Sequence, residues 1–362
     1  MIIGVDGNEA NVKNKVGVSV YAYNLLRYFS KKSCKDFQFI VYLKHHPLNL
    51  TEETPYFKYQ VVPGNFLWSQ IFLPIRLYRY EKIDIFFSPA HYLPRFCPVP
   101  SVVTIHDLSF HYFPNDFLKK DLYQLKNWTA YSLNKAVKII AVSKTTKKDI
   151  IKQYNLPEEK ISVVYNGFEK KPLGKIEKFK LDVEDKPYIL YVGTIQPRKN
   201  IEVLLDAFSK FKQLYPGFQL IIAGKKGWLY EDTFQKTVDL GLEDDVFFTD
   251  FITDNQLIFL YKNAFCLVLP SFYEGFGIPV LEAMNFGCPV ISSFASSLPE
   301  VGQDACLYFD PNNSYDLVEK LKLIKEDKKV ALELINKGKK RIKDFSWEKC
   351  GEQTLKIISE AL

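Results

Sequence analysis

The stretch CLVLPSFYEGFGIPVLEAMNFG, residues 266–287, decides the fold, because a strand, a loop and a helix follow one another in it. The apolar run at its start favours a buried strand. Pro279 suits the first turn of a helix, where its missing N–H costs nothing, and Gly287 suits the end of that helix. Gly275 and Gly277 let backbone N–H groups approach a ligand closely at the positive end of the helix. The stretch therefore predicts a strand–helix unit with an anion site at the helix start.

The same alternation of short β-branched runs with helical periodicity extends through the rest of the chain, which predicts parallel sheets with crossover helices. We expect strands at 2–6, 37–43, 83–88, 101–107, 138–143, 188–193, 218–224, 245–251, 266–271 and 289–293. We expect helices at 19–31, 122–136, 201–215, 254–265, 278–287 and 347–362. The series restarts after a polar join at 163–188, so we predict two Rossmann-like, doubly wound α/β domains.

Length and charge agree with two domains that face different partners. A chain of 362 residues is too long to fold around one ordinary hydrophobic core. Residues 1–167 hold 22 Lys and Arg against 13 Asp and Glu, whereas the remainder holds 26 against 29. All five histidines also lie in the first part. The basic part is therefore expected to face something anionic.

Neither a membrane span nor a signal peptide is evident, and the six cysteines show no CxxC spacing. We therefore expect reduced, buried thiols in a cytoplasmic protein.

Two carboxylates frame the opening stretch, with Glu274 in the loop and Glu282 one to two turns into the helix. Paired carboxylates serve glycosidases as acid and nucleophile or base. A carboxylate at an anion-binding helix end is better suited to holding hydroxyl groups than to protonating a leaving group, so we favour ligand binding. The plainer alternative, a capping Glu274 and a surface Glu282, stays open from these residues alone.

A second strand-to-helix unit lies in YVGTIQPRKNIEVLLDAF, residues 191–208. Arg198 and Lys199 precede Asn200, a good N-cap, at the start of a strongly periodic helix. Two cations beside the N–H groups of a helix start make a diphosphate site. A solvated basic pair is the common alternative, but two such helix starts in one domain favour function.

The first domain offers its own candidates. His106 and Asp107 follow an apolar strand, and ligands of doubly wound sheets bind beyond the carboxyl ends of strands. A structural histidine is the alternative.

Gly17 opens a helix after the first strand, and its missing side chain would admit a phosphate or sugar. The spacing is not GxGxxG, so a dinucleotide fingerprint is absent, and a plain turn glycine is the alternative.

Together these motifs resemble the family-four retaining glycosyltransferases of the GT-B type, over nearly the whole chain. The specific element is the pair Glu274 and Glu282 in EGFGIPVLEAM. GTIQPRKN, TIHD, KVGVS, AVS with Ser143, and YNG with Asn166 and Gly167 match in the same order. The resemblance implies two Rossmann-like domains, 1–170 and 171–343, that face each other across a cleft. It also implies a C-terminal helix, 344–362, that crosses back to the first domain.

The resemblance also implies roles for individual residues. Arg198 and Lys199 would neutralise the departing diphosphate, Glu282 would hold the nucleotide ribose, and Glu274 and His106 would act near the donor sugar. The implied catalytic set is His106, Arg198, Lys199 and Glu274. The implied substrate-binding set is Gly17, Ser143, Asn166, Gly193, Thr194, Gly275, Phe276, Gly277 and Glu282. No DxD motif stands in a suitable place, and Arg and Lys can replace a metal's charge, so we expect no metal and no other cofactor.

The implied activity is the retaining, front-side transfer of a hexose from a nucleoside-diphosphate sugar to a saccharide or lipid-linked saccharide in surface polysaccharide synthesis. VTIHDL and EGFGIPVLEAM are similar to mannosyltransferase sequences, which favours GDP-mannose over UDP-hexoses as donor. The aromatic and basic stretch FLWSQIFLPIRLYRY, residues 66–80, is either a surface that meets an anionic membrane on its inner face or a buried crossover helix.

Two other functions compete with transfer. A nucleotide-sugar epimerase or a phosphorylase could use the same architecture, and an epimerase would not depend on an acceptor. A non-catalytic nucleic-acid binder would use the basic first domain. Its positive residues are scattered and it has no nucleic-acid motif, so we expect no nucleic-acid partner.

Overall fold

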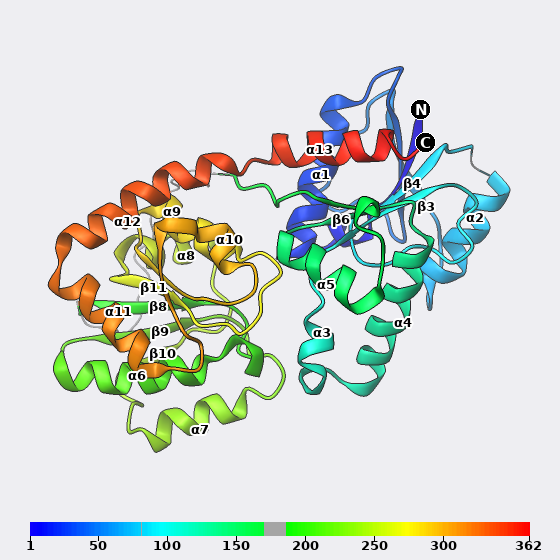
Figure 1. The fold of residues 1–362 in the computed structure, drawn as a ribbon. Helices are drawn as coiled ribbons and strands as arrows, with labels where there is room; N and C mark the ends of the chain where they lie inside the picture. Colours follow the sequence, from blue (N-terminus) through cyan, green and yellow to red (C-terminus); the bar gives the residue numbers. More distant parts are fainter. Residues whose placement is uncertain (81, 170–185) are drawn as a thin grey trace. The chain divides into compact units, whose positions relative to one another are not determined.

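The computed structural model describes residues 1–80, 82–169 and 186–362, and the chain forms two compact units (Figure 1). The first unit comprises Met1–Tyr112, Leu118–Glu169 and Phe345–Leu362. The second comprises Phe113–Phe117 and the described part of Lys170–Asp344. Most of the predicted join at 163–188 lies outside the described residues.

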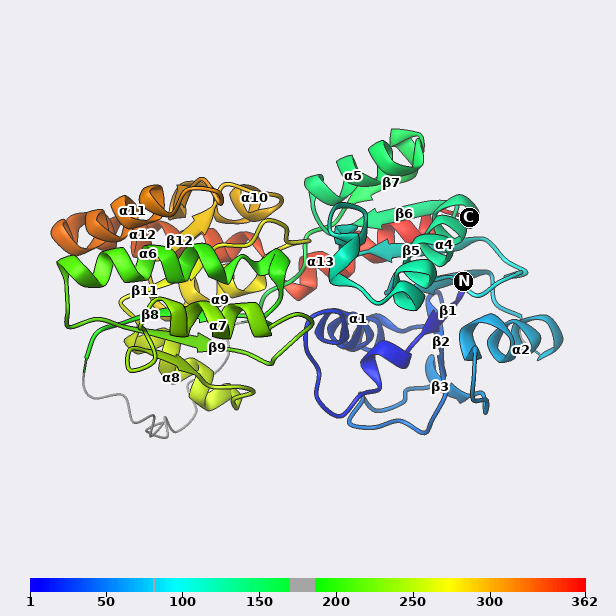
Figure 2. The same cartoon turned by 90° about the horizontal axis from the view of Figure 1, so that it is seen from below.

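The first unit is built on a parallel sheet in the order β3-β2-β1-β4-β5-β6-β7. Its strands are β1 (Ile2–Asp6), β2 (Gln38–Leu43), β3 (Phe57–Val61), β4 (Ile85–Ser88), β5 (Ser101–Ile105), β6 (Lys138–Ala141) and β7 (Ile161–Val163). Its α-helices are α1 (Val18–Lys32), α2 (Phe72–Tyr80), α3 (Ser109–Tyr112), α4 (Lys119–Lys135), α5 (Lys144–Tyr154) and α13 (Trp347–Ser359). Short 3-10 turns are η1 (Asn8–Ala10), η2 (Trp68–Gln70) and η4 (Glu158–Lys160). Helices α1 and α2 lie on opposite sides of β1, β2 and β3 (Figure 2).

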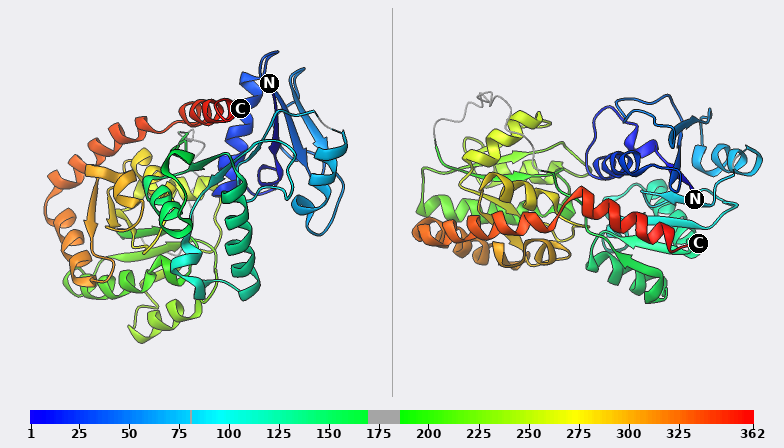
Figure 3. Two further views of the ribbon diagram at one scale, coloured as in Figure 1. Left: turned by 45° about the vertical axis from the view of Figure 1, so that its right-hand side comes forward. Right: turned by 90° about the horizontal axis from the view of Figure 1, so that it is seen from above.

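The C-terminal helix α13 packs against α1, as Figure 3 shows in the view from above. Ser346 caps it by accepting from the Lys349 N–H at 3.1 Å, and Cys350 and Ile358 join the core of this unit. Burial of its apolar face explains why the last residues of the chain belong to the first unit. The predicted return of this helix to the first domain is confirmed.

The second unit repeats the plan with a parallel sheet in the order β10-β9-β8-β11-β12-β13. Its strands are β8 (Tyr188–Val192), β9 (Gln219–Ala223), β10 (Val246–Phe248), β11 (Cys266–Leu269), β12 (Val290–Ser293) and β13 (Cys306–Phe309). Its α-helices are α6 (Ile201–Leu214), α7 (Glu231–Asp239), α8 (Asp254–Asn263), α9 (Ile278–Phe286), α10 (Leu298–Gly302), α11 (Ser314–Glu326) and α12 (Lys328–Arg341). Short 3-10 turns are η3 (Pro114–Asp116), η5 (Pro197–Lys199), η6 (Gln303–Ala305) and η7 (Ile342–Asp344). In Figure 1, α8 and α9 lie above these strands and α6 below them.

Both sheets have the strand order of a doubly wound Rossmann fold, so the predicted α/β class is confirmed. The order reverses beside β1 and β4 in the first unit, and beside β8 and β11 in the second. Ligands of such sheets bind at the carboxyl ends of the strands on either side of that reversal. In the second unit, the two loops at this point carry the RKN and EGFG motifs.

Three strands were missing from the sequence prediction, namely β3, β7 and β13. Each lies at the edge of its sheet and pairs with one neighbour only. Lys58 and Gln60 interrupt the apolar residues of β3 (FKYQV), whereas central strand β9 (QLIIA) is buried throughout. Strands β7 (ISV) and β13 (CLYF) are only three and four residues long, and periodicity does not identify runs this short as strands.

Residues 66–80 are neither a wholly buried helix nor a single helix, because η2 and α2 succeed each other there. Trp68, Leu73 and Leu77 are buried, whereas Ile75 and Tyr78 are exposed. In the described parts of the chain, no helix combines the length and the apolar character that crossing a bilayer requires. All six cysteines are free, and Cys34 is exposed and Cys97 partly so, unlike the buried remainder.

Candidate functional site

The loops that follow β8 and β11 lie next to each other, because these two strands pair in the sheet. Three consecutive residues of the first loop bind the second. The Arg198 carbonyl accepts from the Phe272 N–H at 2.9 Å, the Lys199 ammonium reaches Glu274, and Asn200 donates to the Pro270 carbonyl at 3.1 Å. The two motifs predicted from sequence are therefore one structure.

Asn200 corrects one prediction. It stands at the N-cap position of α6, as expected, but its backbone is left-handed at φ 55° and its side chain makes no capping hydrogen bond among the described residues. The side-chain amide instead donates to the carbonyls of Pro270 and Pro311, at 3.1 and 2.7 Å. Asn200 thus ties the loops together rather than capping the helix, which places Arg198 and Lys199 firmly beside Glu274.

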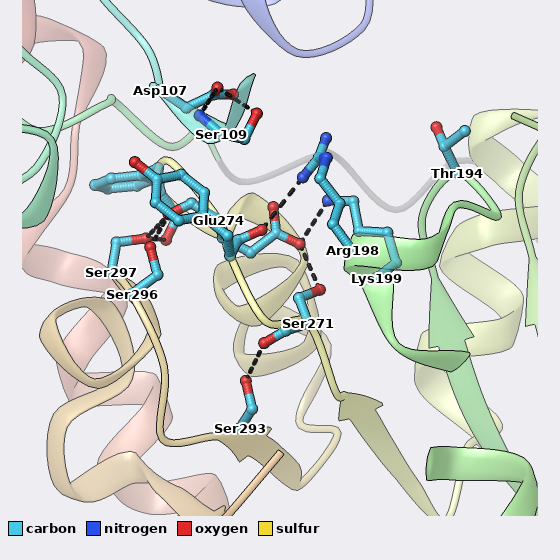
Figure 4. Close-up of polar contacts among 12 residues, drawn as sticks. Asp107, Ser109, Thr194, Arg198, Lys199, Ser271, Glu274, Ser293, Ser296 and Ser297 are labelled. Carbon is cyan, nitrogen blue, oxygen red and sulfur yellow. Dashed lines mark hydrogen bonds and ion pairs between the residues drawn. The ribbon is translucent and has the colours of Figure 1, made fainter. Parts of the chain in front are cut away.

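The Glu274 carboxylate is the centre of a buried polar cluster (Figure 4). Its Oε1 accepts from Lys199 Nζ at 2.6 Å and from Ser271 Oγ at 2.7 Å. The side chains of Lys199 and Glu274 are only 11% and 14% exposed. Burial raises the pKa of Glu274, but the charges of Lys199 and Arg198 and the two hydrogen bonds outweigh it, so the pKa lies below its ordinary value. Glu274 is therefore ionised at neutral pH.

Serine hydroxyls fix the backbone of the same loop. Ser296 and Ser297 donate to the Glu274 carbonyl at 2.6 and 2.8 Å, and Ser297 also donates to the Phe276 carbonyl at 3.0 Å. Figure 4 shows these two serines on the opposite side of the loop from Lys199. Arg198 Nη1 donates to the Tyr273 carbonyl at 3.2 Å. With its carbonyls engaged in this way, the EGFG backbone is held in one conformation.

Helix α9 begins as the sequence predicted. Its N-cap is Gly277, with φ 102°, and a Cβ there would lie 2.7 Å from Leu298, so only glycine fits. Pro279 stands in the first turn and Gly287, with φ 72°, ends the helix. No capping side chain is found for α9 in the described residues, so Glu274 is not its cap. Gly275 and Phe276 lie in the loop between Glu274 and this helix start.

Glu282 lies in the middle of α9 and is partly exposed. Its Oε2 accepts a hydrogen bond from the hydroxyl of Tyr261, on α8, at 3.0 Å. It is therefore more than a surface charge, and its carboxylate is oriented by a neighbouring helix.

The β8 loop also approaches the β9 loop closely. Gly193 has φ 156° and Gly224 has φ 159°, and a Cβ on Gly224 would meet the Gly193 carbonyl oxygen at 1.9 Å. The Tyr191 hydroxyl donates to the Thr194 carbonyl at 3.1 Å. These contacts set the course of the backbone at Gly193 and Thr194, two of the predicted substrate-binding residues.

Asp116, in the segment 113–117 of the second unit, was not predicted. Its Oδ2 accepts from the Arg198 N–H at 3.1 Å, and Phe113 stacks on Phe272 with ring centroids 6.2 Å apart. Burial raises the pKa of Asp116, against the opposing effects of the Arg198 N–H and charge. The acidic side chain of Asp116 thus accepts the backbone N–H of Arg198, one of the two cationic residues of the site.

The remaining predicted residues belong to the first unit. His106 follows β5 and is buried, and its Nε2 donates to the Pro89 carbonyl at 2.8 Å. Burial, followed by the neighbouring His91 ring, lowers the pKa of His106 to about 4, so the imidazole is neutral at pH 7. Tyr21 of α1 meets its ring edge-on, with centroids 4.8 Å apart. The neutral ring leaves Nδ1 as a hydrogen-bond acceptor.

Gly17 and Ser143 occupy the starts of two helices. Gly17 is the N-cap of α1 with φ 53°, and a Cβ there would meet nothing within 4 Å. Ser143 is fully buried and caps α5 by accepting from the Thr146 N–H at 3.0 Å, so the structure gives it a capping role.

Asn166 is buried, and its Oδ1 finds no hydrogen-bond partner among the described residues. Next to it, a Cβ on Gly167 would lie 2.4–2.6 Å from Trp347. Gly167 therefore admits the first residue of α13, which is a packing requirement.

Ser293 donates to the Ser271 carbonyl at 2.5 Å. The sequence analysis missed the side chains that hold the predicted ones in place, which are Tyr191, Ser271, Ser293, Ser296, Ser297, Tyr261 and Asp116. A signal existed for the serines, because SSFASS at 292–297 follows an apolar run as the other site loops do. Nothing local marks Tyr261 or Asp116, whose partners lie 21 and 82 residues away in sequence.

Known protein families and relatives match most of the length of the chain. The family model described as Glycosyltransferase Family 4 matches residues 16–171, and the one described as Glycosyl transferases group 1 matches residues 175–341. The chain is 33% identical to O-antigen chain mannosyltransferase B of Escherichia coli over 76% of this chain and 74% of that protein. It is 35% identical to the O-antigen chain mannosyltransferase RfbU of Salmonella typhimurium over 62% of this chain and 60% of that protein.

Solved structures share the fold at low identity. Sucrose-phosphate synthase from Thermosynechococcus elongatus superposes with a TM-score of 0.78 at 18% identity, covering 99% of this chain and 98% of that one. Anabaena HepE, solved in complex with UDP-glucose, has a TM-score of 0.74 at 19% identity and covers 99% of both chains.

Proposed function

Because the chain belongs to glycosyltransferase family 4, with the group 1 glycosyl transferase region in its second half, we propose that it transfers a hexose with retention of configuration. The donor is a nucleoside-diphosphate sugar, and the acceptor is a saccharide or lipid-linked saccharide in the synthesis of a surface polysaccharide. The bond between the anomeric carbon and the diphosphate oxygen breaks. The acceptor hydroxyl attacks on the same face, and its proton passes to the departing diphosphate.

The observation that carries this proposal is the cluster of Arg198, Lys199 and Glu274 at the reversal of the second sheet. Lys199 and Arg198 carry positive charge at the carboxyl ends of β8 and β11, where a ligand of this fold binds. Fixed charges that face a departing diphosphate stabilise it without reorganisation, which is the most effective form of electrostatic catalysis. The ionised Glu274 holds Lys199 in position and presents its remaining oxygen towards the donor sugar.

The other site residues take supporting roles. Glu282 holds the ribose hydroxyls, and the N–H groups of Gly275, Phe276 and Gly277 meet the sugar or phosphate. With two cations present, we propose that no metal is needed. For the first unit, we propose that the neutral His106 contacts a sugar and that Gly17, at the N-terminus of α1, admits a phosphate.

Mannose is the proposed sugar and GDP-mannose the proposed donor. The support is the activity of the two O-antigen relatives, both of which are mannosyltransferases. UDP-hexoses are the alternative, since Anabaena HepE was solved with UDP-glucose. A thermal-shift screen against UDP, GDP, ADP and their sugars tests the proposal, because a ligand that binds only the folded state raises its stability. Stabilisation by GDP and GDP-mannose is expected, and stabilisation by none of the nucleotides would contradict the proposal.

We also propose that residues 66–80 meet an anionic membrane that carries the acceptor. Phe66, Ile71, Phe72, Ile75 and Tyr78 are exposed large apolar side chains. Arg79 is exposed on the same side of α2, and residues 64–80 contain no Asp or Glu. An apolar helix face with basic residues and no acidic ones fits the surface of an anionic bilayer.

Flotation with vesicles of phosphatidylglycerol and phosphatidylcholine tests this contact. The protein should float at low salt and less so as salt screens charges beyond a Debye length of about 8–10 Å. Ile75→Glu with Tyr78→Glu should abolish flotation, whereas the matched control Leu332→Glu, on an exposed apolar residue of α12, should not. Equal flotation of both variants would refute the assigned surface.

A further inference from the structure

Tyr261 stands directly behind Glu282. Helix α8 packs on α9, and the Tyr261 hydroxyl donates to Glu282 Oε2 at 3.0 Å. Tyr261 is only 1% exposed, whereas Glu282 is partly exposed. The hydroxyl therefore reaches the carboxylate from the interior of the unit.

The tyrosine ring is itself fixed. It stacks on Phe286, one turn beyond Glu282 on the same helix, with centroids 6.0 Å apart and planes 18° apart. Burial, and then the charge of Glu282, raises the pKa of Tyr261 well above its ordinary value. The hydroxyl consequently stays protonated at every working pH and acts towards the carboxylate as a donor.

A carboxylate can accept about four hydrogen bonds through its two oxygens. The Tyr261 hydroxyl holds one carboxylate oxygen of Glu282 from behind and so restrains the rotamer of this side chain. Fixing a side chain before binding avoids the entropy cost of ordering it later, which corresponds to about 2- to 10-fold in affinity.

We propose that Tyr261 is a positioning residue that orients the Glu282 carboxylate to accept hydrogen bonds from the ribose hydroxyls of the donor nucleotide. This inference rests on the proposed function and adds to it the residue that orients Glu282 for binding of the ribose. Tyr261 acts only through Glu282, so its removal should affect ligands that carry ribose hydroxyls and spare those that lack them.

The test uses titration calorimetry on the full chain with whichever of GDP and UDP binds the wild-type protein more tightly, and with its 2′,3′-dideoxy counterpart. Tyr261→Phe should weaken binding of the parent nucleotide by about 2- to 10-fold, because the Glu282 side chain must then be ordered on binding, and should leave binding of the dideoxy form unchanged. Glu282→Gln should reduce the preference for ribose more strongly. The double variant should bind no more weakly than Glu282→Gln alone.

Tyr188→Phe is the matched control. It also deletes a buried tyrosine hydroxyl, which donates to the Leu260 carbonyl at 2.8 Å, next to Tyr261 in sequence. It should lower Tm as Tyr261→Phe does but leave the ribose preference intact. If Tyr261→Phe does not fold, Phe286→Leu, which loosens the ring while keeping the hydroxyl, should give the same effect more weakly.

The outcomes separate the inference from the function on which it rests. An unchanged ribose preference in Tyr261→Phe, with a lost preference in Glu282→Gln, would overturn the role of Tyr261 alone. An unchanged preference in Glu282→Gln would overturn the ribose assignment and the inference with it. Binding of neither nucleotide by the wild-type protein would overturn the proposed function as well.

Discussion

Removing the Lys199 ammonium should expose how strongly the site depends on one buried ion pair. In Lys199→Met, Glu274 keeps its burial and loses the nearest of the charges that oppose it. Deleting one partner of a buried pair typically costs about 3–5 kcal/mol, because the other charge is left uncompensated. With Ser271 and Arg198 still nearby, we expect about 3 kcal/mol at pH 7.

The pH dependence follows from the direction of the pKa. In the wild-type protein the pKa of Glu274 is lowered, so its contribution to stability is present above the ordinary pKa of 4.5 and is lost as pH falls through the folded-state value. In Lys199→Met, burial should raise the pKa instead, so ionised Glu274 destabilises the fold as pH rises. The difference in stability between the two proteins should therefore grow from pH 4 to pH 7.

Urea unfolding at several pH values, for wild type, Lys199→Met, Glu274→Gln and the double variant, measures this. The coupling energy should be about 2–3 kcal/mol at pH 7 and shrink towards pH 4. Lys236 and Asp206 form the control pair, since their atoms are also 2.6 Å apart but their side chains are 27% and 32% exposed. Lys236→Met should cost at most about 1 kcal/mol. A pH-independent coupling energy, or equal costs in both pairs, would refute the reasoning.

Three further predictions concern catalysis. Replacing Arg198 and Lys199 together by Ala should remove most activity and weaken nucleoside diphosphate binding in a folded protein; unchanged affinity would exclude the diphosphate role. Activity should survive excess EDTA, and loss that Mg²⁺ or Mn²⁺ restores would reveal a metal site. Glu282→Gln should mainly raise the donor KM, by about 1.5–3 kcal/mol of binding free energy, whereas Glu274→Gln should lower kcat more than it raises KM; azide rescue at either position would indicate a glycosidase instead.

The sequence was most informative where one local pattern determines structure. The central strands β1, β8, β9 and β11 are apolar runs buried on both faces, and Pro279 and Gly287 marked the ends of α9 before any contact was known. Edge strand β3 could not be recognised because Lys58 and Gln60 interrupt its apolar residues, and β13 (CLYF) could not because periodicity does not identify so short an apolar run as a strand.

The sequence predicted the side chains expected to contact a ligand, but not the contacts that hold those side chains in place. The sequence predicted that Lys199 and Glu274 lie near one ligand. It did not predict that they bind each other, because this contact joins residues 75 positions apart. Asn200 was expected to cap α6, but its side chain donates hydrogen bonds to the carbonyls of Pro270 and Pro311 instead. Tyr261 and Asp116 carry no local signature, because their importance arises from packing between elements distant in sequence.

Transfer itself is tested most directly by the products formed from the donor that stabilises the protein most. Nucleoside diphosphate should be released quickly only when an acceptor is present, from a panel that includes methyl α-mannoside and a synthetic lipid-linked saccharide. Nuclear magnetic resonance of the product should show the anomeric configuration of the donor. Release at the same rate without acceptor, or an inverted product, would contradict retaining transfer at the Arg198, Lys199 and Glu274 cluster.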